Sequence, residues 1–196
     1  VSRCGYRVSW ATTIASMNVP NALATTRILL TPVVMALVLF RSRIDNAYGI
    51  AVTVFVIAAL TDFADGYLAR RWQITSTLGA FLDSVADKIL MTGSILVLVE
   101  VDRAWSWAAF ILIGREFLVM GLRGVAALNQ AKLPPSFWGK LKTNFQFWAI
   151  GLALVRGTER LGAMFLDEWV MTAAVIATIA SGWDYFRHSG VVLRSD

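Results

Sequence analysis

Four aspartates lie in a stretch of the chain that is bordered on both sides by long apolar runs. The stretch covers residues 62–87 and has the sequence DFADGYLARRWQITSTLGAFLDSVAD. Asp62 and Asp65 are three residues apart, and Asp83 and Asp87 are four apart, so each pair lies on one face of a helix. If the intervening loop lets the two helices run antiparallel, the four carboxylates come together.

Carboxylates grouped in this way indicate metal chemistry. Their oxygens suit hard divalent cations such as Mg²⁺, Mn²⁺ or Ca²⁺. Two metals held by four shared carboxylates can stabilise the attacking and leaving oxygens of a phosphoryl displacement. An aspartate at bilayer depth costs about 2.5–3.5 kcal/mol, and four cost about 10 kcal/mol on the same scale. The alternative, simple pairing with Arg70, Arg71 and Lys88, does not require the small residues that accompany the aspartates.

The residues between the aspartates favour a phosphate-bearing ligand. Gly66, Ala69 and Gly79 are small and leave room for a flat ligand or for close approach of the backbone. Arg70 follows Asp65 by about one helical turn, and its guanidinium can pair with a phosphate in a fork geometry.

The composition predicts a polytopic membrane protein. Of the 196 residues, 57% are hydrophobic and 16% are charged, and the mean hydropathy is +0.62. Soluble domains average about 25% charged residues. The net charge of +5 does not come from one basic arm, which disfavours nucleic acid and favours anionic lipid and phosphate as partners. The single cysteine, Cys4, excludes a disulfide within the chain.

Six apolar segments have the length of a membrane-crossing helix, about 20 residues. We therefore predict an all-α fold in one domain, residues 1–196, with six transmembrane helices after a short N-terminal juxtamembrane segment. The predicted helices cover residues 20–40, 47–70, 78–99, 105–128, 139–155 and 168–186. An even number of crossings places both termini on one side, and basic residues gather there. By the positive-inside rule, the termini and the aspartate-rich stretch face the cytoplasm.

The aspartate stretch also resembles a family signature. Its pattern is Asp-x2-Asp-Gly-x2-Ala-Arg-x8-Gly-x3-Asp-x3-Asp, beginning at Asp62, and it is similar to the signature of the CDP-alcohol phosphotransferases. The resemblance implies transfer of a phosphatidyl-type group from a CDP-linked lipid to an alcohol, with release of CMP. It further implies a homodimer in a bacterial-type inner (plasma) membrane.

The resemblance assigns a role to each matching position. Asp62, Asp65, Asp83 and Asp87 would hold two divalent metals, Mg²⁺ or Mn²⁺, and Asp87 would also be the base that deprotonates the acceptor hydroxyl. Gly66, Ala69 and Gly79 would line the pocket for the cytidine of the CDP-lipid. Arg70 would bind its diphosphate, and Ser76 would be a further contact to the nucleotide.

Three further stretches resemble members of the family that use glycerol phosphate. They are NVPNALATTRILLTP (18–32), GREFLVMGLR (114–123) and WGKLKTNFQ (138–146). They imply CDP-diacylglycerol as donor and glycerol 3-phosphate as acceptor. Asn21 and Arg27 match and would contact the CDP-lipid, whereas Ala24 stands where those members commonly have threonine.

An acceptor that carries a phosphate needs cations near the metal site. The candidates are Arg115, Arg123, Lys140 and Lys142, and Glu116 could orient one of them. Arg115 and Arg123 are eight residues apart and so lie near one helix face. The alternative is that these cations only set the topology.

Two other functions stay open at this point. Members of the family that use inositol phosphate also need a basic pocket, so a phosphatidylinositol-phosphate synthase is the nearest alternative. A divalent metal transporter is the alternative from another class, since paired acids also occur along ion paths. Arg70 and Arg71 beside the aspartates would repel a passing cation, which disfavours transport.

Overall fold

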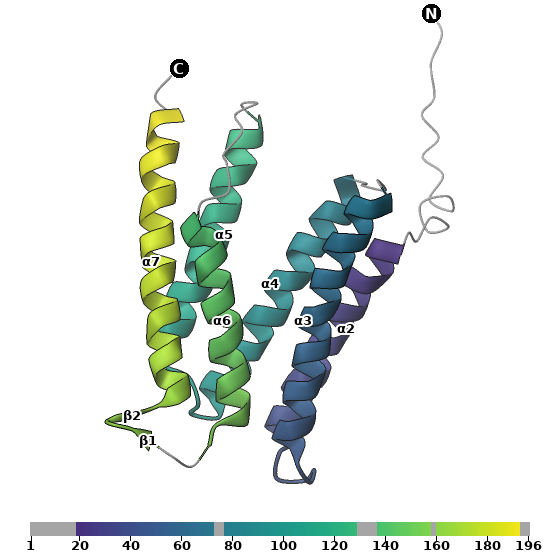
Figure 1. Cartoon of the computed structure of the whole chain (residues 1–196), viewed down its shortest axis with the longest axis vertical. Coiled ribbons are helices and arrows are strands. Elements are labelled where there is room, and N and C mark those ends of the chain that lie inside the picture. The colour runs from purple at the N-terminus through teal and green to yellow at the C-terminus, as the bar shows by residue number, and fades with distance from the viewer. Residues whose placement is uncertain (1–18, 73–76, 129–136, 158–159, 193–196) are drawn as a thin grey trace, which may run out of the picture.

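The computed structural model describes the backbone of residues 19–72, 77–128, 137–157 and 160–192. Side chains are described for residues 24–61, 81–126, 139, 141–157 and 160–187. Over these ranges the chain forms long helices and one short hairpin, so the all-α prediction is confirmed (Figure 1). The predicted N-terminal juxtamembrane segment lies outside the described residues.

The helices follow the predicted apolar segments closely. They are α2 (Val19–Leu39), α3 (Ala47–Trp72), α4 (Thr77–Glu100), α5 (Ser106–Leu128), α6 (Phe137–Val155) and α7 (Leu166–Val192). Their ends lie within a few residues of the predicted ends, except that α7 continues beyond the predicted residue 186 to Val192.

The hairpin between α6 and α7 was not predicted. Strand β1 (Arg160–Leu161) pairs antiparallel with β2 (Met164–Phe165). Gly162 in the turn has a φ of 73°, a backbone conformation that glycine adopts without steric cost.

No helix in the described part of the chain combines the length and the apolar content needed to cross a membrane.

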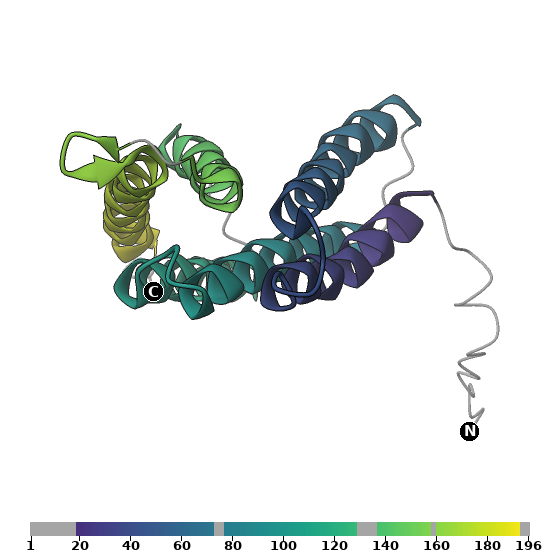
Figure 2. The same cartoon turned by 90° about the horizontal axis from the view of Figure 1, so that it is seen from below.

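The helices form two groups that meet along a central contact. Helices α2, α3 and α4 pack together on one side, and α5, α6 and α7 on the other (Figures 1 and 2). Helix α6 contacts both α3 and α4, and α4 also contacts α5. Helices α3 and α4 run in opposite directions, as predicted (Figure 1).

Small residues and one aromatic stack bring the helices together. A Cβ on Gly93 of α4 would lie 2.5 Å from the Thr31 methyl of α2, so only glycine permits this close approach. The rings of Phe55 and Phe147 stack with centroids 5.2 Å apart and join α3 to α6. The two helix groups therefore share one buried apolar core.

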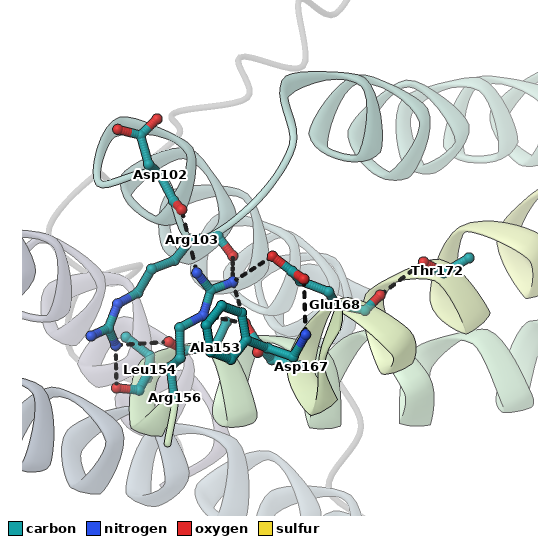
Figure 3. A network of polar contacts seen from close by, with 9 residues as sticks. Asp102, Arg103, Ala153, Leu154, Arg156, Asp167, Glu168 and Thr172 are labelled. Atoms are coloured by element: carbon teal, nitrogen blue, oxygen red, sulfur yellow. Dashed lines mark hydrogen bonds and ion pairs between the residues drawn. The ribbon is translucent and has the colours of Figure 1, made fainter. Parts of the chain in front are cut away.

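A network of charged groups holds the end of the molecule at which α6 ends and α7 begins (Figure 3). The Arg156 guanidinium donates to Asp167 Oδ2 at 2.9 and 2.7 Å and to Glu168 Oε1 at 3.3 Å. Arg103 donates to the carbonyl oxygens of Ala153 and Leu154, both at 3.0 Å. These bonds join the α4–α5 connection to α6 and α7.

Arg103 is also held by an aromatic ring. Its guanidinium lies 3.6 Å from the centroid of the Tyr48 ring on α3, within the range of a cation–π contact. Burial lowers the pKa of Arg103, while Tyr48 acts in the opposite direction. The α4–α5 connection is thereby fixed to α3 as well.

We expect the Asp167→Asn substitution to destabilise the fold. Asp167 is 3% exposed. Loss of its negative charge leaves the Arg156 guanidinium paired with Glu168 among the described residues. Breaking a buried pair costs about 3–5 kcal/mol, and because Glu168 remains as a partner we expect a cost of about 3 kcal/mol. For a chain of this size, the midpoint of thermal unfolding should fall by roughly 6–12 °C.

The matched control is Asp102→Asn. Asp102 is a neighbour in the same network, but it accepts from Arg156 through its backbone carbonyl, and its side chain is exposed. Its φ of 56° suits asparagine. Equal midpoints for Asp167→Asn and the unaltered protein would show that the network does not hold this end of the fold.

Candidate active site

Two of the four predicted metal-binding carboxylates have described side chains. Asp83 and Asp87 lie one turn apart on α4, and both are partly buried. Asp62 and Asp65 belong to α3, but their side chains lie outside the described residues. Of Asn21, Gly66, Ala69, Arg70 and Gly79 only the helical backbone is described, and Ser76 lies outside the described residues altogether.

Arg27 links the three helices of the first group. It is fully buried, and its Nε donates to the carbonyl oxygen of Ala58 on α3 at 3.2 Å. Its Nη1 lies 3.4 Å from Asp83 Oδ1 on α4. The structure therefore places Arg27, a predicted contact of the CDP-lipid, beside a predicted metal ligand.

A polar pocket of about 550 Å³ opens between α4, α5, α6 and α7. Its charged lining residues are Asp87, Lys88, Arg115, Glu116, Arg123 and Lys142. Asp87 and three of the four predicted phosphate-binding residues thus line one pocket, while the Lys140 side chain lies outside the described residues. Four basic and two acidic side chains give the described lining a positive excess, which suits an anionic ligand.

Helix α5 contributes two arginines to this pocket, and α7 holds both of them. Arg115 Nη2 donates to Ser181 Oγ at 2.6 Å, and Nη1 donates to Glu116 Oε1 at 3.3 Å. Arg123 Nε donates to the Tyr185 hydroxyl at 2.6 Å. Ser181 and Tyr185 were not predicted as site residues, although a pair of hydroxyl residues four apart in an apolar helix was a signal for them.

An ion pair between α5 and α6 contributes to the lining of the polar pocket. Lys142 is buried and pairs with Glu116. Lys88 Nζ donates to the backbone carbonyl and the hydroxyl of Ser84 at 3.2 and 2.9 Å, within α4. Glu116, predicted to orient one of the cations, contacts both Arg115 and Lys142.

An apolar groove of about 410 Å³ adjoins the polar pocket. It lies between α2, α4 and α5, and its apolar walls include Met35, Ile89, Leu96 and Phe117. Lys88 and Met120 line both the groove and the pocket. The two spaces together could hold an anionic group and a hydrocarbon chain side by side.

The donor set around Asp83 and Asp87 is compatible with a hard divalent cation. Both side chains offer carboxylate oxygens on one face of α4, the ligand type that Mg²⁺ and Mn²⁺ prefer. Among the side chains that the structure describes, no group of three or more histidine, cysteine or acidic residues is arranged to hold a metal. The full set of four aspartates extends beyond them.

Comparison with known proteins gives a consistent result. A family model described as CDP-alcohol phosphatidyltransferase matches residues 17–180. A Bacillus subtilis protein is 34% identical over 192 residues, covering 91% of this chain and 98% of its own. A Haemophilus influenzae protein is 38% identical over 183 residues, covering 91% and 95%. A Rickettsia typhi protein is 34% identical over 173 residues, covering 87% and 96%. All three carry the name CDP-diacylglycerol–glycerol-3-phosphate 3-phosphatidyltransferase.

Proposed function

The chain belongs to the CDP-alcohol phosphatidyltransferase family, and we propose that it transfers a phosphatidyl group from CDP-diacylglycerol to glycerol 3-phosphate. The products are phosphatidylglycerol phosphate and CMP. The observation that carries the proposal is the polar pocket, in which Asp87 lies with Arg115, Arg123 and Lys142. Family membership sets aside the metal transporter.

The donor is assigned to the α2, α3 and α4 side of the chain. We assign divalent metal, Mg²⁺ or Mn²⁺, to Asp62, Asp65, Asp83 and Asp87, where it would neutralise charge on the diphosphate of the donor. CDP-lipid contacts are assigned to Asn21, Arg27, Gly66, Ala69, Arg70, Ser76 and Gly79. The family model spans most of the chain, which supports treating it as one domain.

Asp87 is assigned as the general base. Its carboxylate takes the proton from the acceptor hydroxyl, and the oxygen attacks the phosphorus of the phosphatidyl group. The new P–O bond forms as the bond to CMP breaks, and CMP leaves with the electron pair. Asp87 suits this role because it lines the pocket with the cations assigned to the acceptor.

The phosphate of the acceptor is assigned to the basic wall of the polar pocket. Arg115, Arg123 and Lys142 supply positive charge there, and Lys140 is assigned to the same set. Arginine forks match phosphate oxygens in a bidentate geometry. An acceptor without a phosphate, such as serine or free inositol, would leave this charge unbalanced.

We place the enzyme in a bacterial-type plasma membrane, with the active site and both termini facing the cytoplasm. The donor is a lipid, and large apolar side chains such as Leu60, Phe110 and Ile176 are exposed on the outside of the helices. Trp107 and Trp183 are 76% and 68% exposed. Tryptophan is enriched at membrane interfaces, so exposed tryptophans fit this location. The apolar groove suits an acyl chain of the donor. The family resemblance also supports a homodimer.

Acceptor profiling tests the reaction directly. Purified protein with CDP-diacylglycerol and Mg²⁺ or Mn²⁺ should release CMP with glycerol 3-phosphate, and much less with inositol phosphate, inositol or serine. Chelation of the divalent metal should stop CMP release. Preferential release with inositol phosphate would replace the acceptor, and release with none of the four would contradict the proposed function.

We expect Asp87→Asn to abolish turnover, because asparagine cannot accept the proton. General bases contribute about 10²–10⁴ to rate, so kcat should fall by at least about 100-fold, while CDP-lipid binding is partly kept. Asp45→Asn is the matched control, since Asp45 is exposed in the α2–α3 connection. A kcat for Asp87→Asn equal to that of the control would remove Asp87 as the base.

We expect Arg123→Ala to raise the KM for glycerol 3-phosphate by about 10-fold or more, the value of a hydrogen bond to a charged group. The KM for CDP-diacylglycerol should change much less. Steady-state kinetics with each substrate varied in turn measure both constants. Arg43→Ala, at an exposed arginine of the α2–α3 connection, is the control. An unchanged acceptor KM would exclude Arg123 from the acceptor site.

A further inference from the structure

Helix α7 presents two buried hydroxyl groups to the arginines of α5. Ser181 and Tyr185 lie one turn apart, and they are 0% and 4% exposed. A buried hydroxyl is costly unless it is hydrogen-bonded. Each of these two accepts a short bond from an arginine, Ser181 from Arg115 and Tyr185 from Arg123, both at 2.6 Å.

The ring of Tyr185 also lies near both guanidinium groups. The guanidinium carbon of Arg123 is 5.2 Å from the ring centroid, and that of Arg115 is 6.0 Å away. Aromatic rings attract cations at these distances. One side chain of α7 therefore stabilises two like charges that would otherwise repel each other across the pocket.

The bonds from α7 leave phosphate-binding hydrogens on each arginine. Arg123 uses its Nε for Tyr185, so its two terminal nitrogens keep the fork geometry that suits a phosphate. Arg115 makes one bond from each terminal nitrogen, to Glu116 and to Ser181, and each of those nitrogens carries a second hydrogen. The arginines are thus held by α7 and can still donate to a ligand.

We propose that Ser181 and Tyr185 are positioning residues, which orient Arg115 and Arg123 for the phosphate of the acceptor and make α7 a determinant of acceptor specificity. The inference rests on the proposed function, since the acceptor is glycerol 3-phosphate. An arginine side chain loses substantial rotamer freedom when it is fixed by a ligand. Fixing it beforehand through α7 reduces that loss and tightens binding.

The test removes each hydroxyl and keeps the rest of the side chain. In Tyr185→Phe and in Ser181→Ala, the KM for glycerol 3-phosphate should rise about 10-fold, as for the loss of one hydrogen bond to a charged group. The kcat and the KM for CDP-diacylglycerol should stay within about 2-fold, because neither hydroxyl is assigned to the donor or the base. Ser181→Thr keeps the hydroxyl and should restore the acceptor KM.

Binding of inorganic phosphate gives a second readout that does not need turnover. Calorimetry should show phosphate affinity about 10-fold weaker in Tyr185→Phe and Ser181→Ala than in the unaltered protein. This readout separates the two proposals. If the unaltered protein releases no CMP with glycerol 3-phosphate, the proposed function fails, while the phosphate affinities still decide whether α7 positions the arginines.

Two matched controls remove comparable groups elsewhere. Tyr48→Phe removes a phenol hydroxyl from another ring that holds an arginine, Arg103, in the α4–α5 connection. Ser94→Ala removes a buried serine hydroxyl for which the described residues provide no hydrogen-bond partner. Neither should change the acceptor KM or the phosphate affinity.

Two results would overturn the inference. The first is an unchanged acceptor KM and an unchanged phosphate affinity in both α7 variants. The second is a fall in kcat together with a rise in both KM values and a fall in thermal stability. That pattern would show that the hydroxyls only hold α7 against α5.

Discussion

The ion pair between Glu116 and Lys142 joins α5 to α6, and both residues line the polar pocket. Lys142 is buried, and its acidic partner compensates for part of the hydration that a buried ammonium loses. The pair therefore links α5 to α6 in the lining of the pocket. Arg115, which also contacts Glu116, and the α7 residue Ser181 depend on the same arrangement.

The two ends of the molecule use buried charge differently. At one end, two arginines, Arg103 and Arg156, share a network with two acidic residues, Asp167 and Glu168, and the network joins the helix connections. At the other end, the described lining of the polar pocket has more basic than acidic side chains. A compensated network stabilises the fold, whereas uncompensated positive charge is available to an anion. The core between them is apolar, which separates the two sets of charges.

The proposed chemistry divides between the two helix groups. Apart from Ser76, the residues assigned to the donor belong to α2, α3 and α4, and those assigned to the acceptor phosphate belong to α5 and α6. Asp87 and Lys88 on α4 line the pocket that the second group completes. A base in this position can act on an acceptor held by one group while the donor is held by the other. Acceptor choice can then vary through α5, α6 and α7 without change to the donor residues.

The sequence by itself determined the helices, the aspartate spacing and the family signature. Apolar runs of helical length predicted the helix ranges to within a few residues at most ends, and a helical period placed Arg115 and Arg123 near one face. The period does not say which neighbour that face meets. Only the tertiary structure decided that Ser181 and Tyr185 meet those arginines and that Arg27 lies beside Asp83. These contacts join residues more than 50 positions apart, and only packing of the whole bundle brings them together.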